Sequence, residues 1–491
     1  MEQPPNLQEM DDAAILKKMG YEQELHRHMS AFSNFAISFS IICILAGGIT
    51  AFPQALGAGG GISIGIGWPL GALFAGIVAL SMAQISSSFP TAGGLYHWSS
   101  ILGGRAYGWI TAWFNLLGLI FVVASVNMGV YDVFFKASIA PMIGIDPASL
   151  GYAEQVAFLT VMTAIQAVLI FRFAKLTTLL TDFSGYLILV LSIILTLSLL
   201  IYSPVPLDFN KLFTFTNFTG KEGSPWPEYG GFLMPFLSGL LLTIYTITGF
   251  DASAHTSEET RNAAAVVPRG IITSVLYSAI FGFIVICTFV LVMPDLEAGV
   301  KMGMGYFEAL LSSLPVGLRS GLSIGIFLAN FLCGLACLTS CSRMMYAFAR
   351  DGGLPASDTL RKVHPTLNTP VAATWVSAVL AVVVTMYGDG FVVLSTGCAV
   401  FLYISYVMPT AAGILAEGKT WTQKGPFNLG SLSKPIAVLA VLGGALLVFV
   451  GMQPPNEKVL YLTIAMIGGM IAFWFLFGES KRFKGPPNIQ Q

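Results

Sequence analysis

The stretch TITGFDASAHTSEETRN, residues 246–262, follows the apolar run GGFLMPFLSGLLLTIY at residues 230–245. The run has the character of a membrane helix, yet it leads into Gly249, which weakens a helix. It also leads to the carboxylate of Asp251, and an ionisable side chain within a membrane is costly and indicates function. The stretch therefore predicts a membrane helix that is interrupted at a functional point.

The composition supports a membrane environment for the whole chain. Of 491 residues, 55% are hydrophobic and 10% are charged, and the mean hydropathy is +0.76. Soluble globular domains carry about 25% charged residues. The net charge of −1 provides no basic face for a nucleic acid, so we expect an all-α polytopic protein whose surroundings are the lipid bilayer.

Apolar stretches of about 20 residues, the length that crosses a hydrocarbon core, predict twelve transmembrane helices. Their expected starts lie near Phe32, Trp68, Tyr107, Tyr152, Thr178, Gly231, Gly270, Ser320, Pro370, Phe391, Ser433 and Val459. All six cysteines fall within apolar stretches, which predicts free thiols rather than a disulfide framework. The polar N-terminus lacks a signal-peptide cleavage site and is expected to be a tail.

The basic residues predict the orientation of the chain. This helix count places 18 of the 24 Lys and Arg residues on the side of the termini and six on the other. The positive-inside rule then puts both termini in the cytoplasm. The longest outward loop, residues 203–230, contains the N-glycosylation sequence Asn217-Phe218-Thr219, which is used only in a eukaryotic secretory pathway.

The first segment contains a second weak point, CILAGGITAFPQALGAGGG at residues 43–61. Gly47, Gly48 and Pro53 are residues at which membrane helices break. Segments one and six stand five helices apart and so run in opposite directions, as two inverted repeats of five helices require. The alternative is that the glycines only allow close helix packing.

Three ordered motifs together resemble the amino acid–polyamine–organocation (APC) transporter superfamily. They are FPTAGGLYHWSSILGGRAYGWITAW (89–113), GFDASAHTSEETRNAAAVVPRGI (249–271) and SRMMYAFARDGGLP (342–355). The run FDASAHTSEET is similar to the amino acid/choline branch, which includes GABA, choline and amino acid permeases. The resemblance covers roughly residues 25–480 and implies a LeuT-type 5+5 inverted repeat with broken helices 1 and 6, two extra C-terminal helices and alternating access.

The resemblance places the substrate at the two breaks. In segment one the substrate-binding element maps to Ala46, Gly47, Gly48 and Ile49, where free amides would bind a carboxylate. In segment six it maps to Tyr245, Gly249, Phe250 and Asp251. For Asp251, direct contact with an ammonium group, control of coupling and a structural role all remain open, and ordinary packing is the alternative for the two aromatic residues.

Further polar positions complete the expected site. Asn115 in segment three and Cys337 in segment eight are substrate-binding candidates. Asn330, Tyr403 and Asp251 are candidates for coupling or gating. Packing or an interhelical hydrogen bond is the alternative for each, and no metal or cofactor is expected.

The sequence favours a secondary transporter over an enzyme or a channel. The five histidines lack catalytic spacing, and no charged ring or repeated filter sequence occurs. The region Asn330 to Gly334 lacks the hydroxyl pair of sodium-coupled relatives, so protons or exchange are favoured over sodium. The expected substrate is an amino acid or amine such as GABA, with choline or another quaternary amine as the alternative and a membrane enzyme as a remote one.

The predicted division of the chain has four parts. A cytoplasmic tail (1–30) precedes a ten-helix transport core (31–415), two additional helices (416–478) and a second cytoplasmic tail (479–491). The plasma membrane is the expected location. The oligomeric state is left open.

Overall fold

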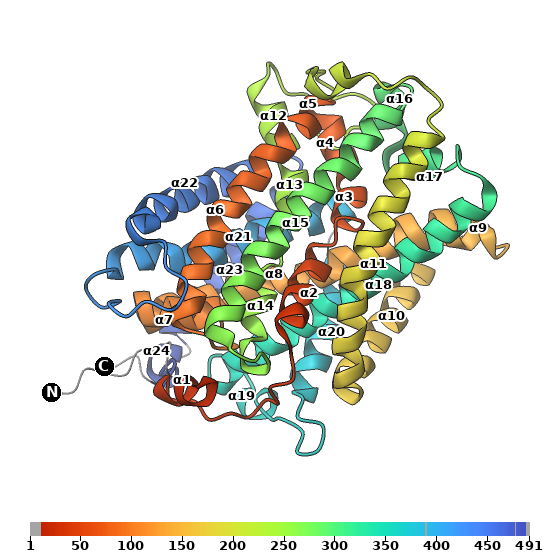
Figure 1. Ribbon diagram of the computed structural model, residues 1–491. Helices are drawn as coiled ribbons and strands as arrows, with labels where there is room; N and C mark the ends of the chain where they lie inside the picture. Colours follow the sequence, from red (N-terminus) through yellow and green to blue (C-terminus); the bar gives the residue numbers. More distant parts are fainter. Residues whose placement is uncertain (1–10, 388–389, 477, 488–491) are drawn as a thin grey trace.

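The computed structural model describes residues 11–387, 390–476 and 478–487, and in these ranges the regular elements are helices (Figure 1). Twelve stretches of apolar helix span the bundle: α2 (Ala31–Ile42) with α3 (Gly47–Thr50) and α4 (Phe52–Gly59), α6 (Gly67–Ser88), α8 (Arg105–Gly129), α10 (Tyr152–Arg172), α11 (Ala174–Ile201), α12 (Leu233–Gly239) with α13 (Leu241–Thr246), α15 (Ala263–Val292), α18 (Val316–Arg350), α20 (Val371–Tyr387), α21 (Phe391–Ala416), α22 (Ser433–Gly451) and α23 (Glu457–Phe475). The chain is thus an integral multi-pass membrane protein of all-helical fold.

The predicted helices correspond one to one with these stretches. Ten of them are long and apolar enough to cross a membrane, while α12 with α13 and α20 are shorter. The largest difference is in α15, which begins at Ala263, seven residues before the expected start at Gly270. The helix extends past the apolar core because Ala263–Ala265 are good helix formers, although Pro268 lies inside it and cannot donate a backbone hydrogen bond. The predicted tails continue into residues 1–10 and 488–491, outside the described residues.

The first and sixth spans are both interrupted, and they run in opposite directions (Figure 1). In the sixth span, α13 ends at Thr246 and α14 (Ala252–His255) begins at Ala252, so the predicted interruption around Gly249 is confirmed. In the first span the chain leaves the helix at Cys43 and re-enters it at Gly47. The predicted break at Ala46–Gly48 therefore lies a few residues too late, and Gly47 and Gly48 belong to the helix that follows it.

Shorter elements cover the two ends of the bundle. At one end, which we call the terminal end, lie α1 (Asp12–Lys18), α7 (Leu95–Gly103), α19 (Ser357–Leu360) and α24 (Glu479–Arg482). The opposite end, the loop end, carries α5 (Ile62–Gly65), α16 (Leu296–Met302) and α17 (Tyr306–Leu311), while α9 (Ala140–Met142) extends α8 through a π-helical stretch. Segment 203–230 packs against α4 at this end, where Trp226 Nε1 donates to Gln54 O at 2.7 Å.

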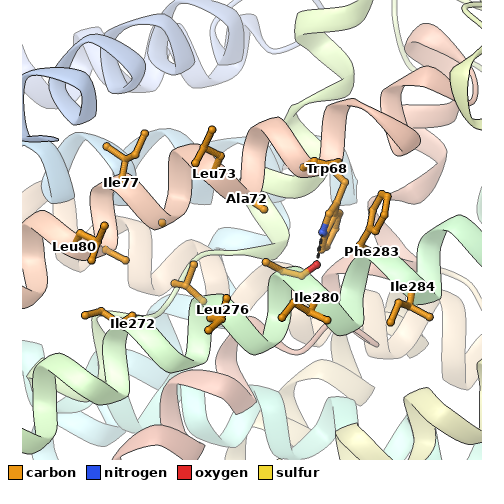
Figure 2. Close-up of a pocket in the computed structure, with 15 residues that line it drawn as sticks. Trp68, Ala72, Leu73, Ile77, Leu80, Ile272, Leu276, Ile280, Phe283 and Ile284 are labelled. Atoms are coloured by element: carbon orange, nitrogen blue, oxygen red, sulfur yellow. Dashed lines mark hydrogen bonds between the residues drawn. The ribbon is translucent and has the colours of Figure 1, made fainter.

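An apolar groove of about 560 Å³ lies between α6 and α15 (Figure 2). It runs from Trp68, whose Nε1 donates to Ala279 O at 2.9 Å, toward Leu80 and Ile272. None of the residues that line it belongs to either helix break. The groove is therefore separate from the predicted substrate site.

Candidate functional site

The two helix breaks lie against each other at the centre of the bundle. A Cβ at Gly47 would come within 2.9 Å of Thr246 Cα, and a Cβ at Gly249 would come within 2.1 Å of Ile41 Cγ2. Ser38 Oγ, on the same half of the first span as Ile41, donates to Phe250 O at 2.9 Å. The glycines thus allow the backbones of spans one and six to meet at the breaks.

The break in the first span leaves backbone donors free. Within the described ranges, the amides of Gly48 and Ile49 at the start of α3 have no hydrogen-bond acceptor, and neither does that of Ile44 in the unwound stretch, whereas the Leu45 amide is directed at the Cys43 thiol. The first amides of any helix lack an intrahelical partner and carry a partial positive charge. These three free N–H groups are suited to a carboxylate.

The backbone carbonyls at the breaks are satisfied by side chains from neighbouring helices. Asn330 Nδ2 donates to Leu45 O at 3.3 Å, and Cys333 Sγ lies 3.4 Å from Ile41 O, both from α18. From α21, the Tyr403 hydroxyl donates to Ile247 O at 3.0 Å. These contacts explain why the first span unwinds before its glycine pair, because α18 provides partners for carbonyls that a continuous helix would have paired.

Asp251 is fully buried and accepts hydrogen bonds on both carboxylate oxygens. Tyr406 OH donates to Oδ1 at 2.8 Å. Asn115 Nδ2 and His255 Nε2 both lie 3.1 Å from Oδ2. The side chain therefore connects the sixth span to α8 and α21, and its oxygens are already occupied by protein groups.

Tyr406 also supports the break itself. Its hydroxyl oxygen accepts the Gly249 amide proton at 3.0 Å while donating to Asp251. Its ring lies 4.8 Å from that of Phe250, centroid to centroid. One side chain of α21 thus replaces a helical hydrogen bond and orients the carboxylate.

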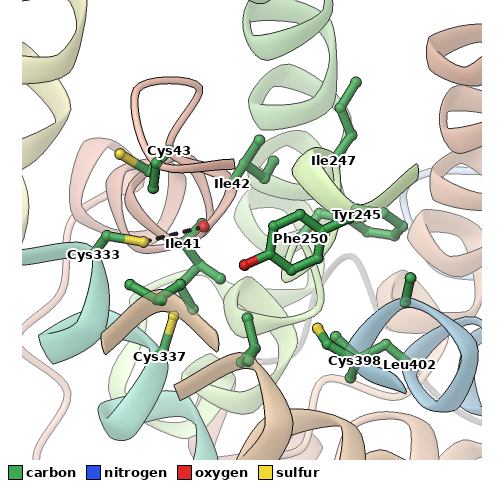
Figure 3. Close-up of a cluster of buried hydrophobic side chains, with 14 of the residues drawn as sticks. Ile41, Ile42, Cys43, Tyr245, Ile247, Phe250, Cys333, Cys337, Cys398 and Leu402 are labelled. Atoms are coloured by element: carbon green, nitrogen blue, oxygen red, sulfur yellow. Dashed lines mark hydrogen bonds between the residues drawn. The ribbon is translucent and has the colours of Figure 1, made fainter. Parts of the chain in front are cut away.

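Thiols and aromatic rings form the wall beside the breaks (Figure 3). Cys333, Cys337 and Cys398 lie around the rings of Tyr245 and Phe250, and the six cysteines are free and buried, as the sequence predicted. Tyr245 OH donates to Ser125 Oγ at 3.0 Å. This wall is apolar and suits an uncharged portion of a ligand.

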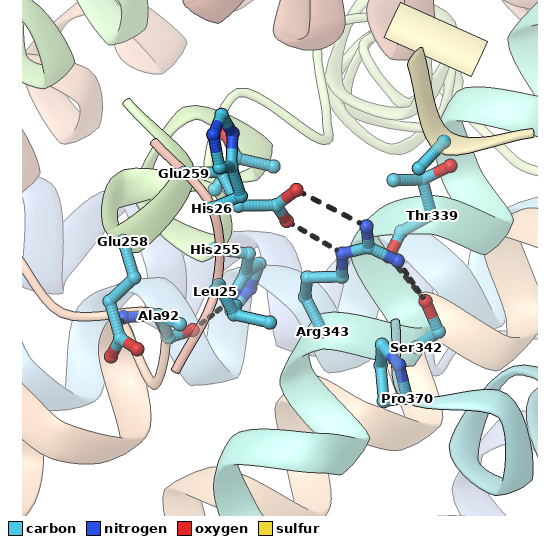
Figure 4. A network of polar contacts seen from close by, with 12 residues as sticks. Leu25, His26, Ala92, His255, Glu258, Glu259, Thr339, Ser342, Arg343 and Pro370 are labelled. Atoms are coloured by element: carbon cyan, nitrogen blue, oxygen red, sulfur yellow. Dashed lines mark hydrogen bonds and ion pairs between the residues drawn. The ribbon is translucent and has the colours of Figure 1, made fainter. Parts of the chain in front are cut away.

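Two buried ion pairs close the terminal end below the breaks, and Figure 4 shows the one between Arg343 and Glu259. Arg343 Nε lies 2.8 Å from Glu259 Oε1, and Arg350 makes a bidentate pair with Glu258 at 2.9 and 3.0 Å. Burial alone would raise the pKa of Glu258, but the Arg350 guanidinium outweighs it and lowers that pKa. Glu258 is therefore held as a carboxylate.

The segment before α2 lies across these ion pairs. Gln23 Nε2 donates to Glu258 O at 2.9 Å, and Arg27 Nη1 donates to Thr260 O at 2.6 Å. The Arg350 guanidinium stacks 3.9 Å from the Tyr21 ring centroid. The N-terminal segment thus covers the terminal end of the broken sixth span.

Comparison with known proteins agrees with this architecture. A family model described as amino acid permease matches residues 29–476. The chain belongs to the amino acid permease family. It is a transporter of the APC superfamily and not an enzyme, and its substrates fall in the amino acid and amine class.

The permease is similar to plant and fungal proteins over almost its full length. It is 33% identical to the amino-acid permease BAT1 of Arabidopsis thaliana, with 97% of this chain and 96% of that protein covered. It is 33% identical to a BAT1 homolog of Oryza sativa subsp. japonica, with 96% and 95% covered. A putative polyamine transporter of Candida albicans is 29% identical, with 90% and 80% covered.

The permease brings most of the expected site residues together. Ala46, Gly47, Gly48 and Ile49 lie at the first break, and Gly249, Phe250 and Asp251 lie at the second. Asn115 bonds Asp251, Tyr403 bonds the second break, and Asn330 bonds the first. Gly48 faces α15, since a Cβ there would meet Ile286 Cγ2 at 3.5 Å.

His255 and Tyr406 were not identified as site residues from the sequence. The spacing between histidines does not identify His255. The informative spacing is that of His255 four residues after Asp251, one helical turn along α14. No pattern in the sequence pairs Tyr406 with Asp251, because that contact joins helices 155 residues apart.

Proposed function

We propose that the permease moves a small amino acid, or an amino-acid-like amine such as GABA, across the membrane by alternating access. The observation that carries this proposal is the group of free amides at Ile44, Gly48 and Ile49, beside the break in the sixth span. A carboxylate bound there would replace the missing hydrogen bonds of a broken helix. The alternative substrate, choline, offers these donors one neutral hydroxyl oxygen and no carboxylate.

In this proposal the substrate's ammonium group does not bind to Asp251. Both of its oxygens already accept hydrogen bonds from protein side chains, so an ammonium would have to displace one of them. The aromatic faces of Tyr245 and Phe250 offer cation–π contacts instead. The apolar wall containing Cys337 then favours a substrate whose remaining portion is neutral, and disfavours polyamines.

The proposal extends to topology and energetics. The ten-helix core comprises residues 31–415. The protein lies in the plasma membrane with both termini in the cytoplasm, and transport is driven by protons or by exchange. In support, the α18 side chains at the first break are the amide of Asn330 and the thiol of Cys333, so the hydroxyl pair of sodium-coupled relatives is not found there, and a thiol is a poor sodium ligand.

A substrate panel in proteoliposomes tests the proposal. Purified permease should take up labelled GABA or a neutral α-amino acid, and unlabelled amino acid should compete while choline and putrescine should not. Choline that competes as well as the amino acid would transfer the assignment to quaternary amines. Uptake of none of these solutes would refute the proposed substrate class.

A further inference from the structure

His255 has only one tautomer that fits its surroundings when its ring is neutral. Its Nδ1 lies 3.1 Å from Ala92 O (Figure 4), and a carbonyl oxygen only accepts. Nδ1 must therefore carry a proton. Its Nε2, 3.1 Å from Asp251 Oδ2, is then left without one unless the ring is charged.

The contact between Nε2 and Oδ2 consequently requires one proton. That proton sits on Oδ2, with a neutral carboxyl donating to the ring, or on Nε2, with an imidazolium donating to the carboxylate. Both arrangements keep the bonds from Asn115 and Tyr406, because those groups donate to Asp251 in either case. Removing the proton leaves two lone pairs facing each other at hydrogen-bonding distance, an arrangement that must open.

The groups around this pair leave it as the place where a proton can be bound and released. From α21 the titratable neighbours are Tyr406, Tyr403 and Cys398, from α8 the neighbour is the neutral Asn115, and beyond Ala92 lie Glu258 and its partner Arg350. Among described residues, the other buried acids, Glu258, Glu259 and Glu479, each pair with an arginine. Of these acids, Asp251 alone pairs with a histidine.

We propose that Asp251 and His255 together bind the single proton that is coupled to transport, with the substrate bound beside this pair and not on it. This inference rests on the proposed function and names its coupling site. On release, the O–H or N–H bond breaks and the proton passes to water admitted from the terminal end. The unpaired Oδ2 and Nε2 then separate, and because Asp251 is held by Asn115 and Tyr406 while His255 is held by Ala92 O, this separation shifts α14 against those contacts.

Coupled and uncoupled transport in proteoliposomes test the pair. The variants are His255→Gln and Asp251→Asn, which keep the approximate shape but cannot share a proton. The matched control is His97→Gln, because His97 is also buried and neither of its ring nitrogens has a hydrogen-bond partner among the described residues. For each protein, accumulation driven by a pH gradient is divided by counterflow exchange of the same labelled amino acid.

We expect this ratio to fall at least tenfold in both pair variants and to stay at the wild-type value in His97→Gln. A wild-type ratio in His255→Gln would overturn the inference, while wild-type exchange would leave the proposed function standing. Absence of exchange in the wild type itself would instead refute the proposed function.

A second measurement uses only the wild-type protein, so it does not depend on whether a variant folds. Wild-type permease in lightly buffered detergent, mixed with its substrate, should bind or release about one proton per substrate molecule, as reported by a pH-indicator dye. Solutions buffered at two strengths provide the control for solvent effects. A stoichiometry of zero across pH 5 to 8 would overturn the inference.

Discussion

Replacing Gly249 by alanine tests the meeting of the two broken helices. Gly249 has φ +87°, a conformation that costs a residue with a Cβ about 1–2 kcal/mol. The new methyl would lie 2.1 Å from Ile41 Cγ2, and overpacking a closed core costs about 1–3 kcal/mol. We therefore expect Gly249→Ala to lower the free energy of unfolding by about 2–5 kcal/mol and to impair exchange.

Two comparisons separate the causes of this loss. Gly48→Ala is the matched control, because its Cβ would lie 3.5 Å from Ile286 Cγ2, an ordinary contact. Combining Gly249→Ala with Ile41→Ala removes the clashing methyl, so the double variant should be more stable than the two single effects predict by about 1–3 kcal/mol. Denaturant unfolding in detergent measures the wild type, the three single variants and the double variant. Equal stabilities of the two glycine variants, or additive effects with Ile41→Ala, would refute the close approach.

Three further predictions concern the remaining contacts. Tyr406→Phe removes the donor to Asp251 and the acceptor of a backbone amide, so unfolding in detergent should show a loss of about 1–3 kcal/mol, and an unchanged stability would contradict the contact. Cysteines at Lys221 and Lys419, both exposed, should label on opposite sides, so an impermeant maleimide on intact cells should modify only the first, and equal labelling would contradict the topology. Burial raises the pKa of Asp351 despite the nearby arginine, so the contribution of this side chain to stability is lost as pH rises. Asp351→Asn should therefore raise the unfolding temperature more at pH 8 than at pH 5. A difference that does not change with pH would contradict the raised pKa.

The helices and one of the two breaks were predictable from the sequence for a physical reason. Crossing a hydrocarbon layer requires a long apolar run, which the sequence shows directly. The break at Gly249 was predictable because a helix-weakening residue and a charge coincide there. The break in the first span depends instead on partners from α18, namely Asn330 and Cys333, and a glycine pair alone marked a position a few residues too late.

The partners of Asp251 were less predictable, because three of the spans contribute to them. Asn115 was expected as a separate substrate contact, yet it donates to Asp251. Its other bond, to Ser405 Oγ at 3.1 Å, joins α8 to α21. Such contacts follow from the packing of helices distant in sequence, whereas the i, i+4 spacing of Asp251 and His255 is present in the sequence itself.

The backbone of Ala92 connects the proton pair to the closed terminal end. Its carbonyl accepts from His255 Nδ1 at 3.1 Å, and the amide of the same residue donates to Glu258 Oε1 at 3.0 Å. Glu258 in turn holds Arg350, and Arg350 stacks on Tyr21 of the N-terminal segment. Any movement of His255 that follows proton loss must therefore break its bond to Ala92 or pull on a residue that the ion pair also holds. Displacing the partners of a buried ion pair is strongly destabilising. The closed arrangement of the terminal end is therefore stable while the proton is bound and is destabilised when the proton leaves.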